Sequence, residues 1–293
     1  MMKIIESPRE GMQGFSRIIP ASEKIRYIDL LIRAGFDTVE IGSIVSPRLV
    51  PQMADSLDVL RKLNLSGTSA NLMFLALNAR GAQTLAGVDV ITHISYPFSF
   101  SPAFLKLNVN STVEQSLDTA ELLTGLCQKH GKQAVIYISM AFGNPYGDPW
   151  SIDILVEWVS RLHQAGARII PLSNVSMEIG PAMISEVYST LIPMFPDIEF
   201  GLHLHTANLG WYERVDAAYQ AGCRRFDGVI NGWGGCPMAG REMLGNLKTE
   251  NLVEFAVLKK IPVEIRHDVF IEACQMATEV FGNNKYGILN IEL

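Results

Sequence analysis

The chain has 293 residues, 48% of them hydrophobic, and a formal net charge of -6 at pH 7. This composition supplies enough apolar surface for a sizeable buried core, and its negative charge gives no long-range attraction to nucleic acid or anionic lipid. No window approaches the ~18 apolar residues of a membrane span, and Pro8 interrupts the first apolar stretch too early for a signal peptide. The four cysteines are scattered without a CxxC pair, which is typical of a reducing compartment, so we expect a cytoplasmic protein without membrane or nucleic-acid partners.

Short apolar runs alternate along the chain with longer runs of helical period, as in repeated βα units. The apolar runs predict eight strands, at 3–6, 38–41, 67–72, 88–95, 133–140, 168–172, 199–204 and 225–230. The amphipathic runs predict helices at 22–34, 112–130, 152–165, 182–194, 212–221 and 249–258. Three of these helices end in Ala-Gly, and a glycine at that place accepts the left-handed conformation that closes a last turn.

The strict alternation of eight strands with helices favours an α/β fold, a single (β/α)8 TIM barrel over about residues 1–260. An open doubly wound sheet is the alternative, but no G-x-G-x-x-G follows the first strand. No linker rich in Pro, Gly or Ser divides the chain, so we predict one catalytic domain over 1–293. A further helix at about 267–281 belongs to a C-terminal extension, 261–293, that either caps the barrel or joins a dimer.

The histidines His203 and His205 form the first candidate metal site. On a strand, their spacing points both side chains to one face, and a neutral imidazole is the commonest ligand for a transition metal. The alternative is a pair of histidines that only make backbone hydrogen bonds at a strand end. Because the chemistry of such barrels lies at the carboxyl ends of the strands, other polar residues predicted there matter as well.

Several such polar residues follow the predicted strands. Arg9 and Glu10 come after the first strand, Glu40 ends the second, Asn71 follows the third, and Asn246 follows a glycine-rich stretch after the eighth. One carboxylate, two imidazoles and one amide oxygen form a mixed N/O set that suits Mg²⁺, Mn²⁺, Fe²⁺, Co²⁺ or Zn²⁺. The sequence therefore predicts a divalent metal site with open positions for a substrate.

Four stretches resemble a known family. They are SPREGMQ at 7–13, SPRLVPQMAD at 46–55, the histidine pair, and GGCP at 234–237 followed by GNL at 245–247. In this order they resemble the metal-dependent TIM-barrel lyases and acyltransferases, and specifically the 3-hydroxy-3-methylglutaryl-CoA lyases, over nearly the whole chain. The resemblance implies a bound Mg²⁺ or Mn²⁺, and it places the ligand roles on Glu10, His203, His205 and Asn246.

The resemblance also implies catalytic and substrate-binding residues. Arg9, always charged and carrying forked donors, is expected to stabilise an enolate oxygen, with Glu40 holding its guanidinium. The alternative for these two is a buried ion pair that only ties two strands together. Cys236 resembles the lid cysteine that transfers a proton, against the alternative of a packed small hydrophobe, and His203 counts as catalytic besides being a ligand. The expected substrate-binding residues are Gln13, Arg48, Asn71 and Asn174.

The chain departs from the family pattern at four places. Glu10 replaces the usual aspartate, and Asn174 stands where the family has the aspartate of Gly-Asp-Thr-Ile-Gly. An amide cannot act as a carboxylate base, so Asn174 either binds substrate passively or marks a changed reaction. Thr206 begins a Thr-Ala pair that replaces the common Asp-Thr, and Met73 stands where a lysine is expected after the third-strand asparagine.

These observations predict a metal-dependent carbon-carbon lyase that cleaves 3-hydroxy-3-methylglutaryl-CoA, or a related 3-hydroxyacyl-CoA, into acetyl-CoA and acetoacetate. The expected partner is a small-molecule acyl-CoA, and the expected assembly is a homodimer. One alternative keeps the barrel and the ion in a Claisen-type acyltransferase like citramalate or isopropylmalate synthase, or in a 4-hydroxy-2-oxo acid aldolase. Another is a non-catalytic metal-binding scaffold.

Overall fold

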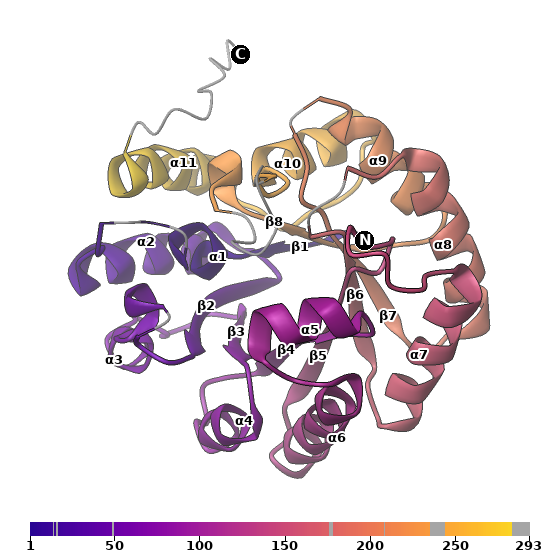
Figure 1. Cartoon of the computed structure of the whole chain (residues 1–293). Helices are drawn as coiled ribbons and strands as arrows, with labels where there is room; N and C mark the ends of the chain where they lie inside the picture. Colours follow the sequence, from indigo (N-terminus) through magenta and orange to yellow (C-terminus); the bar gives the residue numbers. More distant parts are fainter. Residues whose placement is uncertain are drawn as a thin grey trace.

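The barrel is closed by eight parallel strands in sequential order, from β1 to β8 and back to β1 (Figure 1). The computed structural model describes residues 1–13, 15, 17–48, 50–175, 178–207, 209–234 and 244–282. Its strands are β1 (Lys3–Glu6), β2 (Thr38–Ile44), β3 (Asn71–Ala76), β4 (His93–Ser99), β5 (Gln133–Ser139), β6 (Ile169–Ser173), β7 (Glu199–His203) and β8 (Arg225–Gly228). The predicted TIM barrel is confirmed.

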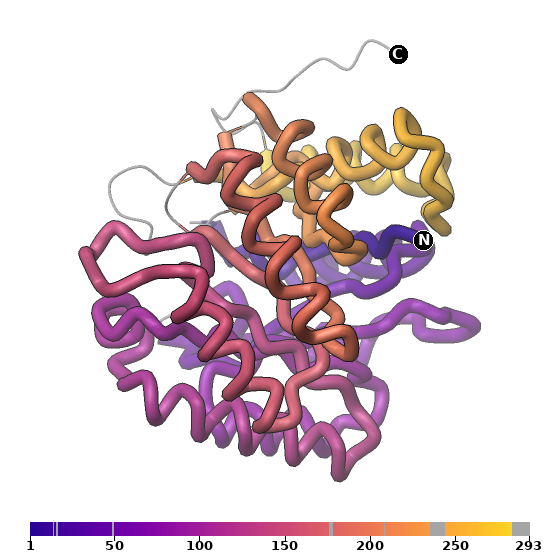
Figure 2. Tube along the Cα trace, turned by 90° about the vertical axis from the view of Figure 1, so that its right-hand side faces the viewer, coloured from indigo at the N-terminus to yellow at the C-terminus, as the bar shows by residue number. Residues whose placement is uncertain are grey.

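Helices surround the strands. In Figure 2, which is turned by 90°, the N-terminus lies at the opposite end of the barrel from α5 (Pro102–Val109). The helices are α1 (Pro8–Gln13), α2 (Ala21–Ala34), α3 (Ser56–Leu60), α4 (Ala79–Ala86), α5 (Pro102–Val109), α6 (Val113–Lys129), α7 (Ile152–Gln164), α8 (Pro181–Met194), α9 (Trp211–Gln220), α10 (Thr249–Leu258) and α11 (His267–Phe281), with short 3-10 turns η1 (Pro51–Met53) and η2 (Ile230–Gly232). The predicted glycine caps Gly35, Gly166 and Gly222 all have positive φ, at 87°, 97° and 104°. No helix within these ranges is long and apolar enough to cross a membrane.

The third and fourth strands start later than predicted, at Asn71 rather than 67 and at His93 rather than 88. Gly67 has φ +72 and lies in a turn, and the amide of Ile91 donates to the carbonyl of Val88 in a second turn. The predicted strands therefore began too early, in residues 67–70 and 88–92 that precede β3 and β4. As a consequence, Asn71 lies at the amino end of β3, opposite the end predicted for it.

The C-terminal helix α11 packs along α2 and extends the ring of helices beside α10 (Figure 1). Tyr27 and Phe281 meet edge to face with ring centroids 5.7 Å apart, and Phe36 meets Phe270 at 6.1 Å. The amide of Arg266 also donates to the carbonyl of Ala34, at 2.8 Å. The structure thus confirms that this helix packs on the barrel, while the dimer stays a prediction.

The interior of the barrel holds a small apolar cluster of its own, separate from the large core that packs between strands and helices. It consists of Ile5, Met73, Val135, Tyr137 and Ile169. Met73 is therefore a residue of the barrel interior, where the family pattern was expected to have a lysine. Above this cluster the interior becomes polar, and that polar layer carries the candidate site.

Candidate active site

Glu10, His203 and His205 lie together at the carboxyl ends of the strands. Glu10 comes from α1, directly after β1, while the histidines end and follow β7. Its Oε2 lies 3.3 Å from His203 Nε2, and its Oε1 lies 3.9 Å from His205 Nε2. The potential ligand atoms of Glu10, His203 and His205 all lie within 4.8 Å of one another, close enough to bind one metal ion. The strand spacing thus brings both imidazoles to one face, as predicted.

Asn246 reaches the same place through a short antiparallel bridge. His205 and Asn246 are directly opposite each other in this bridge, and flanking bonds run from Thr206 N to Gly245 O and from Leu247 N to Leu204 O, at 2.9 and 2.8 Å. Opposite residues of an antiparallel pair point to the same face. The Asn246 amide Nδ2 donates to Trp233 O at 2.7 Å, which leaves its Oδ1 available to the site.

The residues fit a divalent cation because their buried oxygens are incompletely satisfied. Asn246 Oδ1 is buried and has no hydrogen-bond partner among the described residues, and Glu10 Oε2, also buried, has none there beyond the 3.3 Å contact with His203 Nε2. Leaving such acceptors unpaired costs free energy, about 1–3 kcal/mol each, unless another group satisfies them. Two oxygens and two imidazole nitrogens from Glu10, Asn246, His203 and His205 would hold a borderline or hard divalent ion.

The two histidines differ in charge state. Burial and the neighbouring His203 lower the pKa of His205 to about 4, so this imidazole is neutral at pH 7. Burial also acts to lower the pKa of His203, but Glu10 and Asp227 outweigh it and raise that pKa to about 10. For Glu10, burial acts to raise the pKa, but His203 and Arg9 hold it well below its usual range. Glu10 is therefore an anion at neutral pH and can bind a metal cation.

Arg9 stands beside this cluster and is held by three side-chain hydrogen bonds. Its Nε and Nη2 donate to Glu40 Oε2 at 3.1 and 2.7 Å, and its Nη1 donates to Gln13 Oε1 at 2.9 Å. Ser95 donates to the other Glu40 oxygen at 3.1 Å. These bonds use three of the five N–H donors of the guanidinium. Two donors remain for a ligand, with Nη2 only 3.9 Å from Glu10 Oε2.

A second carboxylate, missed in the sequence, lies behind His203. Asp227 on β8 has its Oδ2 3.1 Å from His203 Nδ1, and it accepts a hydrogen bond from the Tyr137 hydroxyl at 2.6 Å. The sequence signal was an acid inside the short strand RFDG, two residues after Arg225 and therefore on the same face. The predicted site residues were expected to follow strands or to end them, whereas Asp227 lies within a strand.

Asn174 clamps the main chain of His205. Its Nδ2 donates to His205 O at 2.7 Å, and its Oδ1 accepts from His205 N at 2.8 Å. Only an amide can make both bonds, since an ionised carboxylate has no donor. The substitution of asparagine for the family's aspartate thus has a structural reason, and the substrate contact expected of Asn174 stays a prediction.

The remaining predicted residues lie farther from the cluster or outside the described part. Asn71 was wrongly placed: it lies at the amino end of β3, where its Nδ2 donates to Asp37 O at 3.0 Å. Another asparagine, Asn78, follows the carboxyl end of β3, where its Oδ1 accepts a hydrogen bond from Gly81 N at 2.9 Å. Arg48 is exposed in the loop after β2, and its substrate role stays a prediction. Cys236 lies outside the described residues.

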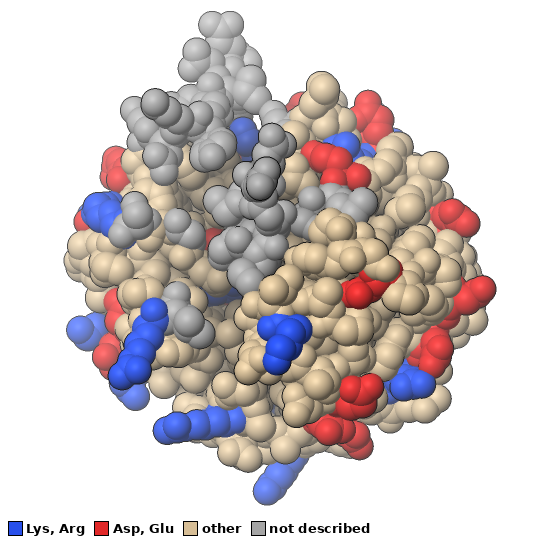
Figure 3. Space-filling view, in the orientation of Figure 1, with Lys and Arg blue, Asp and Glu red and all other residues tan. Residues whose placement is uncertain are grey.

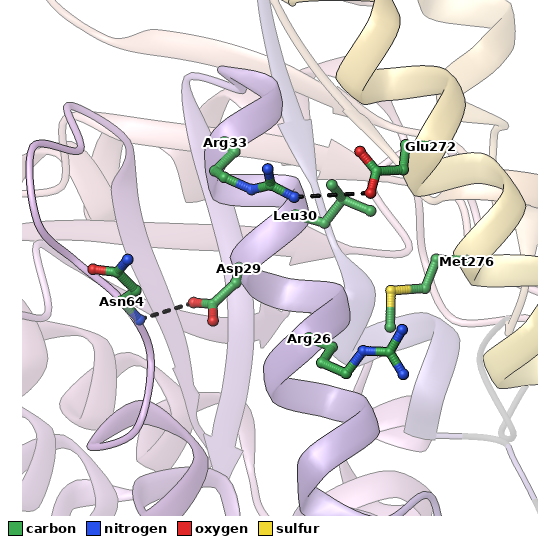
Figure 4. A pocket seen from close by; sticks show the side chains of 7 residues that line it. All are labelled: Arg26, Asp29, Leu30, Arg33, Asn64, Glu272 and Met276. Atoms are coloured by element: carbon green, nitrogen blue, oxygen red, sulfur yellow. Dashed lines mark hydrogen bonds and ion pairs between the residues drawn. The ribbon is translucent and has the colours of Figure 1, made fainter.

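An open pocket of about 310 Å³ lies elsewhere, between α2, the chain after α3, and α11 (Figure 4). Its lining residues are Arg26, Asp29, Leu30, Arg33, Asn64, Glu272 and Met276. Both of its carboxylates have partners: Asp29 accepts from Asn64 N at 2.9 Å, and Glu272 lies 4.0 Å from Arg33 (Figure 4). None of the predicted site residues lines it, so the barrel end remains the candidate active site.

The chain forms a closed eight-stranded barrel, and a cluster of one carboxylate and two imidazoles lies at the carboxyl ends of its strands. These features are typical of (β/α)8-barrel enzymes that bind a metal ion at this end. Comparison with known proteins narrows this class. The sequence profile described as HMGL-like matches residues 2–277, so the chain belongs to the HMGL-like family and is an enzyme of the lyase class.

Several relatives cover most of the chain. It is 29% identical over 285 residues to (R)-citramalyl-CoA lyase of Chloroflexus aurantiacus, covering 94% of this chain and 89% of the relative. It is 30% identical over 253 residues to the mitochondrial hydroxymethylglutaryl-CoA lyase of Bos taurus, covering 86% and 77%. A solved HMG-CoA lyase of Acinetobacter baumannii, in complex with coenzyme A and 3-methylmalate, superposes with a TM-score of 0.90 at 25% identity, covering 100% of this chain and 97% of that one.

Proposed function

We propose that the protein is an acyl-CoA lyase that cleaves a 3-hydroxyacyl-CoA between C2 and C3 with the help of Mg²⁺ or Mn²⁺. The first candidate substrate is 3-hydroxy-3-methylglutaryl-CoA, which yields acetyl-CoA and acetoacetate. Family membership and the names of the relatives support this substrate class. The lysines and arginines toward the lower left of Figure 3, the side of α3 and α4, agree with an anionic ligand.

The observation that carries the proposal is the position of Arg9 next to the Glu10 cluster. Cleavage leaves negative charge on the oxygen of a thioester enolate, and a fixed guanidinium with two free donors can stabilise that charge. The 2.7 Å bond from Arg9 to Glu40 fixes this guanidinium in advance, so it need not reorganise during the reaction. A purely structural Arg9–Glu40 ion pair does not account for its position beside Glu10, one of the proposed metal ligands.

Glu10, His203, His205 and Asn246 would hold the divalent ion, which when bound lowers the pKa of the substrate hydroxyl and orients the breaking bond. His203 stands between the carboxylates of Glu10 and Asp227, with Nε2 toward the metal cluster and Nδ1 toward Asp227. The amide of Asn174 cannot serve as a base. Cys236 keeps its proposed role in proton transfer to the departing carbanion.

A second candidate substrate is citramalyl-CoA. The relative named for it matches 94% of this chain, more than the 86% matched by the Bos taurus relative. The two substrates differ in where the free carboxylate lies, directly on the carbinol carbon in citramalyl-CoA and one methylene away in the other. Both yield acetyl-CoA, so the second product distinguishes them: pyruvate from the former and acetoacetate from the latter.

A coupled assay of both substrates, run with Mg²⁺, with Mn²⁺ and with EDTA, tests the proposal. We expect metal-dependent release of acetyl-CoA from one of them, and a loss of several orders of magnitude in kcat in Arg9→Met, with its metal still bound. Arg33→Met, an exposed arginine on α2, is the control and should behave like the parent. No turnover of either substrate would reject an acyl-CoA lyase of this kind and favour the non-catalytic scaffold. Sedimentation of the same sample tests the predicted homodimer.

A further inference from the structure

A carboxylate inside the barrel holds one of the two candidate metal-ligating histidines from behind. Asp227 is 3% exposed, and its Oδ2 lies 3.1 Å from His203 Nδ1. The same oxygen accepts the hydroxyl of Tyr137 at 2.6 Å, and the ring of Tyr137 meets the ring of His203 edge to face, with centroids 5.5 Å apart. His203 is thus fixed by a hydrogen bond and by a ring contact, and Tyr137 contributes to both.

Asp227 is itself compensated by a buried cation. Arg225 lies two residues earlier on β8, and its Nε is 3.9 Å from Asp227 Oδ1, while its Nη1 donates to Glu199 at 3.3 Å. Gly201 on β7 makes room for this side chain, because a Cβ there would lie 3.0 Å from Arg225 Cδ. The guanidinium of Arg225 therefore offsets part of the cost of burying the Asp227 carboxylate.

The two histidines are oriented by different means. His205 is fixed through its main chain by Asn174, and its Nδ1 has no hydrogen-bond partner among the described residues. His203 is fixed through its ring, since Nδ1 faces Asp227 and Nε2 faces Glu10 at 3.3 Å. An imidazole that donates its Nδ1–H to a carboxylate presents the Nε2 lone pair on its opposite side, where an ion among the Glu10 cluster would bind.

We propose that Asp227, supported by Tyr137, is a positioning residue that selects the Nδ1–H tautomer of His203 and thereby sets the affinity of the site for its divalent ion. This inference rests on the proposed function in so far as that function places a divalent ion at Glu10, His203 and His205. It adds a role that acts through His203, since Asp227 belongs to the layer behind the ligands.

The test compares Asp227→Asn with Glu199→Gln. Both variants remove one carboxylate charge next to Arg225, but only Asp227 touches His203. In Asp227→Asn, the amide oxygen is a weaker acceptor and the NH2 group meets Arg225 unfavourably. We expect Mn²⁺ to bind about 10- to 100-fold more weakly to Asp227→Asn by calorimetry at fixed pH, and Glu199→Gln to bind like the parent.

Ring ¹⁵N spectra of the Mg²⁺-loaded parent should show His203 protonated at Nδ1 alone. Tyr137→Phe should weaken Mn²⁺ binding in the same direction by less than the aspartate variant, and it carries the test if circular dichroism shows that Asp227→Asn is unfolded. A parent that binds neither Mn²⁺ nor Mg²⁺ would overturn the metal site and this inference together. If the parent binds Mn²⁺ and Asp227→Asn binds it as tightly as Glu199→Gln, the positioning role is overturned and the proposed function stands. The same holds if Asp227→Asn is unfolded and Tyr137→Phe binds Mn²⁺ as tightly as the parent.

Discussion

Gly234, which follows β8, lies against the helix that carries Glu10, and this contact can be tested by adding one methyl group. Gly234 has φ +81, and a Cβ at this position would lie 3.0 Å from the Glu10 carbonyl carbon and 3.2 Å from Gly11 Cα. Real Cβ atoms hardly approach backbone so closely. Gly234→Ala must therefore displace α1, and with it the Glu10 carboxylate.

The expected loss has two parts. An alanine with positive φ costs roughly 1–2 kcal/mol, and overpacking against backbone costs about 1–3 kcal/mol more. Gly147 separates the two, because its φ is +80 and nothing lies within 4 Å of its would-be Cβ. Gly147→Ala should therefore lose only the first part, roughly 1–2 kcal/mol. Gly234→Ala should lose about 2–5 kcal/mol in total.

Urea unfolding in EDTA measures these losses without a contribution from bound metal, and a Mn²⁺ titration then measures the affinity of each folded variant. We expect weaker Mn²⁺ binding in Gly234→Ala and parent-like binding in Gly147→Ala. Equal unfolding free energies in the two variants, together with parent-like Mn²⁺ binding in Gly234→Ala, would refute the contact with Glu10.

Three further changes give different readouts. His205→Ala should abolish retention of metal, measured by elemental analysis after gel filtration, and parental metal content would contradict its ligand role. Asn174→Asp should lose about 1–3 kcal/mol of unfolding free energy, because a carboxylate cannot donate to His205 O, and a stability equal to that of the parent would contradict the clamp. Burial raises the pKa of Glu6 from 4.5 to about 8, so the folded state keeps a proton that the unfolded chain has lost. Stability should therefore fall as pH rises from about 5 to 8, by at most about 1.4 kcal/mol per pH unit from this group. Glu6→Gln should remove that part of the slope in unfolding experiments, and an unchanged slope would show that Glu6 ionises normally.

The barrel and its histidine pair could be predicted because they depend on local periodicity. Alternation of short apolar runs with amphipathic ones counts the βα units, and an i, i+2 spacing on a strand fixes the shared face of His203 and His205. The place of Glu10 was also predictable, since it directly follows β1. Its helix α1 was not, because six residues that include Pro8 and Gly11 show no helical period.

The features that were placed wrongly or missed depend on contacts between distant parts of the chain, which local periodicity does not reveal. Asn71 was placed at the wrong end of β3 because residues 67–70 before it were assigned to the strand, and only pairing with β2 shows where the strand begins. Asp227 was missed because a charged residue in a strand gains its meaning from Tyr137, a partner 90 residues away in the sequence. The clamp by Asn174 likewise depends on how β6 is paired with β7.

The charges of the polar layer bear on the kind of substrate that the site accepts. Three carboxylates, Glu10, Glu40 and Asp227, of which the last two are buried, face two buried guanidinium groups, Arg9 and Arg225, and both histidines are neutral once Nε2 of His203 takes a cation. A divalent ion would leave this layer with one surplus positive charge. Unbalanced charge is costly where water is excluded, so the layer favours a ligand that brings a single carboxylate, as both proposed acyl-CoA substrates do. An aspartate in place of Asn174 would cancel that surplus, which gives the amide at this position an electrostatic reason besides its two hydrogen bonds.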